Sequence, residues 1–230
     1  MLFCMAQFVC LCLGLGLLGL LHKLGISGFK QEDDFGNVVL GTLCLQGATW
    51  LLIPFFLRLH QVSWLDAFGF RGPKLKHALL TALGFIIVVL PVVLLLQGAS
   101  VQVLEKFGYP PADQAAVLLL MGAKSCWTTV YLGVFAIVLA PVAEEFIFRG
   151  ILFPFLKKLG FPRLAWFGVS ALFALIHTNL PTFVPLFVFA LALTWLYEKT
   201  DNLLAPITAH ALFNATNFAV LLWQIQHPDA

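Results

Sequence analysis

Three charged residues interrupt one of the most apolar stretches of the chain and are the first candidates for chemistry. Glu144 and Glu145 are adjacent, and Arg149 follows them, within V-L-A-P-V-A-E-E-F-I-F-R-G-I-L-F. A charge at the centre of a membrane-spanning helix costs roughly 2.5–3.5 kcal/mol, so the three together would cost about 8–10 kcal/mol before any pairing. A cost of this size indicates that the three residues have partners or a function.

The spacing of these charges predicts different roles for the two glutamates. Glu145 and Arg149 are four residues apart with the acid first, which is the favourable order for an ion pair on a helix. Glu144 lies about 100° further round a helix and is expected to face a different neighbour. A buried carboxylate without a base beside it suits proton transfer. We therefore expect a structural Glu145–Arg149 pair and a catalytic Glu144.

Two histidines lie in other apolar segments. His177 ends the segment S-A-L-F-A-L-I-H, one helical turn after Phe173. His210, Asn214 and Asn217 are spaced to form a polar stripe on one face of a helix. Each of these residues alone could serve as an interhelical hydrogen bond. Acid, imidazole and amide groups on three apolar segments together favour an intramembrane site.

These side chains are suited to the attack of water on a carbonyl group. Glu144 could act as general base on a water that His177 helps to hold. His210 and Asn214 could donate hydrogen bonds to the oxyanion that develops. Glu144, His177 and His210 also form a two-histidine, one-carboxylate set of the kind found in zinc hydrolases, and the residue types alone do not choose between the two mechanisms. No G-x-S-x-G motif is present, which disfavours a serine hydrolase.

The composition shows which kind of element must position these groups. Hydrophobic residues make up 61% of the 230 residues and charged residues 10%, against roughly 25% charged in a typical globular domain. A soluble chain of this size could not bury so much apolar surface. The net charge of +2 does not favour a nucleic-acid partner. The sequence therefore predicts an integral membrane protein.

Stretches without charge predict the membrane spans. A bilayer core of about 30 Å requires roughly 20 apolar residues as helix. Such stretches cover residues 1–21, 38–57, 78–104, 125–143, 164–197 and 202–223. The fourth continues past the charged residues to Leu156, and Asn179-Leu180-Pro181 divides the fifth into two short helices. We expect an all-α transmembrane helix bundle of about seven spans, or eight if residues 114–123 also cross. We expect residues 1–230 to form a single membrane domain.

The basic residues of the expected loops predict the orientation, because cytoplasmic loops are enriched in Lys and Arg. One side would carry Arg58, Arg71, Lys74, Lys76, Lys157, Lys158, Arg163 and Lys199, and the other Lys23, Lys30, Lys106 and Lys124. The first set and the N-terminus are therefore expected on the cytoplasmic side.

Three motifs occur in order along the apolar segments. They are E-E-x-x-x-R at Glu144, Glu145 and Arg149, F-x-x-x-H at Phe173 and His177, and H-x-x-x-N at His210 and Asn214. Together they closely resemble the motifs of the CAAX protease and bacteriocin-processing family of intramembrane endopeptidases, also called the Abi family. The resemblance covers residues 138–217, which we take as the catalytic motif region.

The resemblance implies an all-helical membrane fold with the active site in a water-accessible cavity. It implies that Glu144 and His177 activate the water, that His210 and Asn214 form the oxyanion site, and that Glu145 and Arg149 support the first glutamate. The mechanism in this family has been assigned both to a glutamate and to a metalloendopeptidase, so zinc remains a candidate cofactor. The implied substrates are peptides or lipidated proteins within membrane lipid, such as prenylated proteins in eukaryotic relatives and bacteriocin precursors in prokaryotic ones.

Two other classes of function are compatible with the same residues. The protein could be a non-catalytic membrane scaffold or a bacteriocin self-immunity protein that binds a partner and uses the polar residues for packing. A transporter is a weaker alternative. No inverted repeat is visible in the sequence, and a coupled carrier would be expected to have more than one acidic cluster. The compact length and the lack of a eukaryotic targeting signal favour the inner membrane of a prokaryotic cell.

Overall fold

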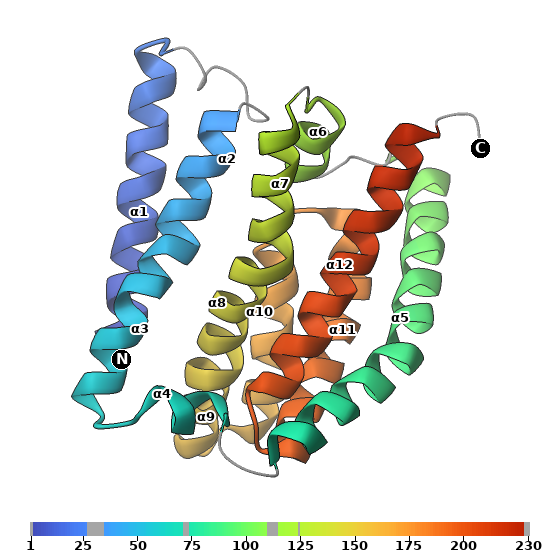
Figure 1. Cartoon of the computed structure of the whole chain (residues 1–230). Coiled ribbons are helices and arrows are strands. Elements are labelled where there is room, and N and C mark those ends of the chain that lie inside the picture. Colours follow the sequence, from blue (N-terminus) through green and yellow to red (C-terminus); the bar gives the residue numbers. More distant parts are fainter. Residues whose placement is uncertain (1, 27–34, 71–73, 110–114, 124, 228–230) are drawn as a thin grey trace. The chain divides into compact units, whose positions relative to one another are not determined.

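The structure is a computed structural model that describes residues 2–26, 35–70, 74–109, 115–123 and 125–227. The described residues form helices joined by short turns, and no strand occurs among them (Figure 1). The expected all-α fold is therefore confirmed.

The chain divides into two compact units. Unit 1 comprises Met1–Ser63 and Gln114–Phe135, and unit 2 comprises Trp64–Asp113 and Ala136–Ala230. Every candidate site residue from the sequence belongs to unit 2. That residues 1–230 act as one membrane domain remains a prediction.

Unit 1 is formed by helices from both of its chain segments. Its elements are α1 (Leu2–Lys23), α2 (Phe35–Thr42), a π-helical turn (Leu43–Gly47), α3 (Ala48–Leu59), α6 (Ala115–Met121) and α7 (Cys126–Val134). Thr49 of α3 donates a hydrogen bond to Gln7 of α1 (3.3 Å), and the Phe3 and Phe56 rings meet edge to face. These contacts hold α1 against α3.

Unit 2 contains the remaining helices. They are α4 (Trp64–Phe68), α5 (Lys74–Lys106), α8 (Ala140–Glu145), α9 (Phe153–Lys158), α10 (Val169–Leu175), α11 (Leu180–Thr200) and α12 (Leu204–Gln226). Helices α5, α11 and α12 pack on one another and are green, orange and red in Figure 1. Their shared core pairs small residues such as Ala82 and Ala209 with the large Phe189 and Leu193, which lets the helices approach closely.

Among the described residues, four helical segments are long and apolar enough to cross a membrane, namely Met5–Lys23, Leu75–Lys106, Cys126–Lys158 and Leu180–Thr200. The protein is therefore an integral membrane protein. All seven expected segments are helical, but Ala48–Leu59 and Leu164–Leu175 are shorter than a span. Helix α12 has 23 residues but is not one of these four segments, because its histidine, asparagine and glutamine residues lower its mean hydropathy. The expected eighth segment is only the seven-residue α6.

The expected helix break near Asn179 is confirmed. Helix α10 ends at Leu175, and the Asn179 side chain caps α11 by accepting a hydrogen bond from the Thr182 backbone nitrogen (3.2 Å). Pro181 occupies the first turn of α11, where its missing N–H costs nothing. The break places His177 in a turn between two helices.

Candidate functional site

The expected ion pair between Glu145 and Arg149 is present. Arg149 Nη1 donates to Glu145 Oε1 at 2.9 Å, and both side chains are fully buried. Glu145 is the last residue of α8, and Arg149 lies in the π-helical segment Phe146–Leu152 that follows. The i,i+4 prediction thus holds although the backbone there is π-helical, a backbone form that is frequent at functional sites.

His210 of α12 contacts both glutamates. Its Nδ1 lies 2.9 Å from Glu145 Oε1 and its Nε2 lies 3.9 Å from Glu144 Oε2. The sequence predicted that the two glutamates would face different neighbours, whereas one histidine lies beside both. The two nitrogens of an imidazole point away from each other, so a single ring can reach two carboxylates that are 100° apart on a helix.

The hydrogen bond to Glu145 fixes the proton at one ring nitrogen. Since an ionised carboxylate only accepts hydrogen bonds, Nδ1 of His210 must donate to Glu145 Oε1. In a neutral ring, Nε2 would then carry no hydrogen. His210 could donate a hydrogen bond from Nε2 only as an imidazolium.

Aromatic rings enclose His210. The ring centroids of Phe173 and Phe189 lie 5.6 and 5.7 Å from that of His210, at interplanar angles of 66° and 82°. Phe213 in turn stacks on Phe189, with ring centroids 4.2 Å apart. These rings restrict the orientation of the imidazole and keep this part of the site apolar, which strengthens the charged interactions within it.

Arg149 also has partners on α11. Its Nη2 donates to the backbone oxygen of Ala190 (2.8 Å), and its Nε donates to the hydroxyl of Thr194 (3.4 Å). The guanidinium lies over the ring of Phe173, at 5.0 Å from its centroid. Thr194 is not among the site residues predicted from the sequence. The available signal was that it is the only aliphatic hydroxyl among residues 183–199.

The Asn214 side chain is part of the same unit but has a backbone partner. Its Nδ2 donates to the carbonyl oxygen of Ala136 at 2.7 Å. Ala136 lies in the π-helical segment Phe135–Leu139, where the backbone donor is five residues further on and would be Pro141. Because proline has no N–H, the amide of Asn214 supplies the hydrogen bond that Pro141 cannot. One hydrogen of the amide nitrogen is used in this way, and a second is left on the same atom.

His177 is partly buried in the turn after α10. Its Nδ1 lies 2.8 Å from the Phe173 carbonyl oxygen, which can only accept, so Nδ1 carries the hydrogen and Nε2 of the neutral ring is an acceptor. The His177 ring packs on Phe173 with centroids 5.0 Å apart. Phe173 therefore contacts both histidines of the predicted site.

The described residues do not bring a metal-ligand set together. Among them, no group of three or more His, Cys, Asp and Glu side chains is arranged to hold a metal ion. Glu144, His177 and His210, the zinc set considered from the sequence, thus do not converge as ligands in this structure.

Comparison with known proteins supports the motif assignment. Residues 125–216 match the family model described as type II CAAX prenyl endopeptidase Rce1-like. The matched segment contains all six predicted site residues and overlaps most of the motif region 138–217. No curated protein and no solved structure matches the chain. The resemblance to the CAAX protease and bacteriocin-processing family is therefore confirmed over residues 125–216.

Proposed function

We propose a specific function within the CAAX-type intramembrane proteases, which the Rce1-like family match of residues 125–216 indicates. The protein is an intramembrane endopeptidase that hydrolyses a peptide bond of a membrane-associated or lipidated protein. The observation that carries the proposal is the position of His210 beside two buried glutamates, with Nδ1 2.9 Å from Glu145 and Nε2 3.9 Å from Glu144. We further propose the inner membrane of a prokaryotic cell as its location.

In the proposed mechanism, His210 acts as an imidazolium beside the two glutamates. Glu144 and Glu145 supply two negative charges and Arg149 one positive charge, all within buried side chains. An imidazolium at this position would be a second cation beside the two carboxylates, and it carries a hydrogen on both ring nitrogens. The imidazolium then has an N–H at Nε2, on the side of Glu144.

Glu144 and His210 can divide the work of hydrolysis. The Glu144 carboxylate takes a proton from water as the water oxygen attacks the carbonyl carbon of the peptide. His210 Nε2–H donates to the oxygen that becomes negatively charged, a role worth about 3–4 kcal/mol for one donor. Glu144 then passes the proton to the leaving nitrogen as the C–N bond breaks, which releases an acid and an amine.

Asn214 and His177 complete the proposed site. The second amide hydrogen of Asn214 is the other donor to the oxyanion, while the first holds Ala136. His177 orients the attacking water through Nε2, which its hydrogen bond to Phe173 leaves as an acceptor. Glu145 and Arg149 act on His210 and do not touch the substrate in this scheme.

The test is cleavage of peptides by purified protein in lipid vesicles. The substrates are a prenylated peptide with a C-terminal CAAX sequence, the same peptide without the prenyl group, and a set of apolar peptides. Wild type and Glu144→Gln are compared with and without a strong chelator, and products are identified by mass spectrometry. We expect fragments whose summed mass exceeds the substrate by one water with wild type only.

The chelator and the inactive variant separate the alternatives. Cleavage that survives the chelator supports the glutamate mechanism, and cleavage that it abolishes supports a metalloendopeptidase. Equal cleavage by Glu144→Gln would contradict the role of Glu144. No cleavage of any substrate by wild type would contradict the protease assignment for these substrates and favour the scaffold or self-immunity function.

A further inference from the structure

One side chain in contact with the charged cluster has no role in the reaction described above. Thr194 of α11 is fully buried, and its hydroxyl accepts a hydrogen bond from Arg149 Nε at 3.4 Å. The same hydroxyl donates to the carbonyl oxygen of Ala190 at 2.9 Å. A hydroxyl has one hydrogen, so this bond turns its lone pairs toward the guanidinium.

Helix α11 therefore holds two of the three guanidinium nitrogens. Arg149 Nε is bound to Thr194 and Nη2 to the Ala190 carbonyl, which leaves Nη1 for Glu145. Because the guanidinium is planar and rigid, fixing Nε and Nη2 also fixes the direction of Nη1. The Thr194 hydroxyl and the Ala190 carbonyl thus determine where Arg149 meets the carboxylate.

The orientation of Arg149 is transmitted to the imidazole by two routes. Glu145 Oε1 accepts hydrogen bonds from Arg149 Nη1 and from His210 Nδ1, both at 2.9 Å. The Phe173 ring lies under the guanidinium and also against His210. A displaced guanidinium would therefore move the acceptor of His210 and one of the rings that enclose it.

We propose that Thr194 is a positioning residue of the active site, which orients His210 through Arg149 and Glu145. This inference rests on the proposed function, in which His210 Nε2–H stabilises the oxyanion. A hydrogen bond of 3.4 Å is long and contributes little to stability, whereas catalysis is sensitive to small displacements of a donor. The effect of losing the hydroxyl should therefore fall on turnover rather than on folding.

The test compares four forms of the protein in lipid. Thr194→Val removes the hydroxyl and nearly conserves the shape, and Thr194→Ser keeps the hydroxyl. Thr200→Val is the control, because Thr200 is also on α11 and its hydroxyl donates to Leu196 O (2.8 Å) and Asn202 O (3.3 Å) without contacting the cluster. We expect Thr194→Val to lower kcat by about tenfold at unchanged KM, since a small misplacement of a catalytic group slows the chemical step. Thr194→Ser and Thr200→Val should retain nearly full kcat.

A second measurement does not depend on turnover. In protein labelled with ¹⁵N-histidine, the ring signals of His210 are identified as those lost in His210→Gln. We expect these signals to shift in Thr194→Val and to stay in place in Thr200→Val. This readout keeps the positioning role testable if no peptide in the panel is cleaved, an outcome that would count against the proposed function only.

Unchanged kcat and unchanged His210 signals in Thr194→Val would overturn the proposal, and so would an equal loss of kcat in Thr200→Val. Thr194→Ala is the second variant if Thr194→Val does not fold, because it removes the hydroxyl without placing a methyl group against the guanidinium. The same outcomes support or overturn the proposal with that variant.

Discussion

Glu145 of α8 accepts hydrogen bonds from His210 of α12 and from Arg149, which is itself bound to α11. Its Oε1 accepts hydrogen bonds from Arg149 and His210, while its Oε2 is buried and has no hydrogen-bond partner among the described residues. Both donors would lose their charged partner if the carboxylate were neutralised. The stability of unit 2 should therefore depend on this side chain more than on any surface ion pair.

We predict that Glu145→Gln and Arg149→Ala each lower the free energy of unfolding by about 3–5 kcal/mol, because each leaves a buried charge without its partner. Thermal or denaturant unfolding in detergent micelles measures this loss. The control is Glu198→Gln, which removes the partly exposed ion pair with Lys157 and should cost at most about 1 kcal/mol. Unchanged melting of both buried variants would contradict the structural role of the pair.

The bond from Asn214 to Ala136 gives a second prediction at this scale. Asn214→Ala should cost about 1 kcal/mol, because a partly buried carbonyl loses its donor. Pro141→Ala supplies a backbone N–H that can reach the same oxygen. We therefore predict that Asn214→Ala costs at least about 0.5 kcal/mol less in the Pro141→Ala background, measured by a double-mutant cycle of unfolding. Strictly additive losses would contradict the assignment of Pro141 as the missing donor.

The sequence was sufficient to predict the Glu145–Arg149 pair, but it revealed neither the contact of Thr194 with Arg149 nor the bond between His210 and Glu145. Glu144, Arg149 and Asn214 stand out because polar residues are costly in apolar helices. The bond between His210 and Glu145 could not be predicted, because it depends on how α8 and α12 are rotated about their axes. That rotation is set by side-chain packing and by the π-helical segments on either side of α8, which helical periodicity does not reveal.

At the scale of elements, the Asn202 side chain, just before α12, binds the backbone of Gly69, just after α4. Asn202 is buried, donates from Nδ2 to Gly69 O (3.0 Å), and accepts at Oδ1 from the Leu204 backbone nitrogen (2.9 Å). Gly69 has φ +74°, and a Cβ there would lie 2.4 Å from Asn202 Cγ. Phe68, the residue before Gly69, stacks on Phe146 next to the cluster (5.5 Å). Phe68 and Gly69 therefore connect the end of α8 to the start of α12.

We predict that Gly69→Ala lowers the free energy of unfolding by about 1–3 kcal/mol more than Gly160→Ala does, since backbone strain and a clash act together at the first position. Gly160 is a matched control because its φ is +88° and no heavy atom lies within 4 Å of a Cβ built there. Both variants are compared by thermal unfolding in the same detergent. Equal losses of stability would mean that the Asn202 side chain can move away from a Cβ at position 69. They would contradict the proposed role of the Asn202–Gly69 contact in stability.

At the scale of the molecule, the composition was enough to predict an all-α integral membrane protein, and the apolar stretches of the sequence located its helical segments. Of the seven expected spans, four lie in helical segments that, within the part of the chain the structure describes, are long and apolar enough to cross a membrane. The segment Leu164–Leu175 has twelve residues, about 18 Å of helix, which is short of a bilayer core of about 30 Å. Hydropathy shows where a chain is apolar, but where helices end depends on caps and turns such as Asn179.

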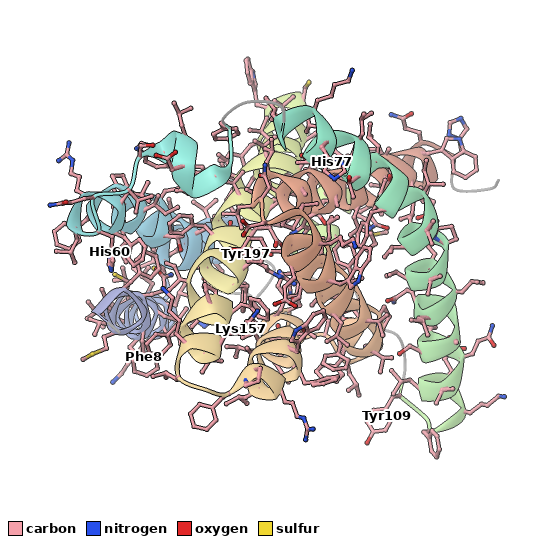
Figure 2. All side chains as sticks on the ribbon, turned by 90° about the horizontal axis from the view of Figure 1, so that it is seen from below. Phe8, His60, His77, Tyr109, Lys157 and Tyr197 are labelled. Carbon is pink, nitrogen blue, oxygen red and sulfur yellow. The ribbon has the colours of Figure 1, made fainter. Side chains whose placement is uncertain are left out.

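Basic residues gather at one end of unit 2. Lys157 of α9, labelled in Figure 2 with Tyr197 of α11, forms an ion pair with Glu198 of α11. Two exposed lysines follow these residues in the chain, Lys158 after Lys157 and Lys199 after Glu198. Helix α12 starts just after this end and runs to Gln226, so its C-terminus lies at the opposite end of the unit. By the excess of Lys and Arg in cytoplasmic loops, the Lys158 end should face the cytoplasm.

We predict that Lys158→Cys is labelled by a membrane-impermeant maleimide only from the cytoplasmic side, and that His227→Cys is labelled only from the other side. The five native cysteines are first replaced by serine, and labelling is compared between intact cells and inside-out vesicles. Labelling of both sites from the same side would contradict the orientation of unit 2.

The central claim is that Glu144 performs the chemistry while Glu145 supports the structure around it. The most direct test is to measure kcat/KM and the unfolding midpoint of Glu144→Gln and Glu145→Gln side by side, on a substrate that wild type cleaves. We predict that Glu144→Gln loses cleavage by at least about 100-fold at a nearly unchanged midpoint, since a general base contributes about that much or more. Glu145→Gln should lose stability as well as activity. A Glu144→Gln protein that still cleaves, or one whose inactivity is fully explained by unfolding, would contradict the account.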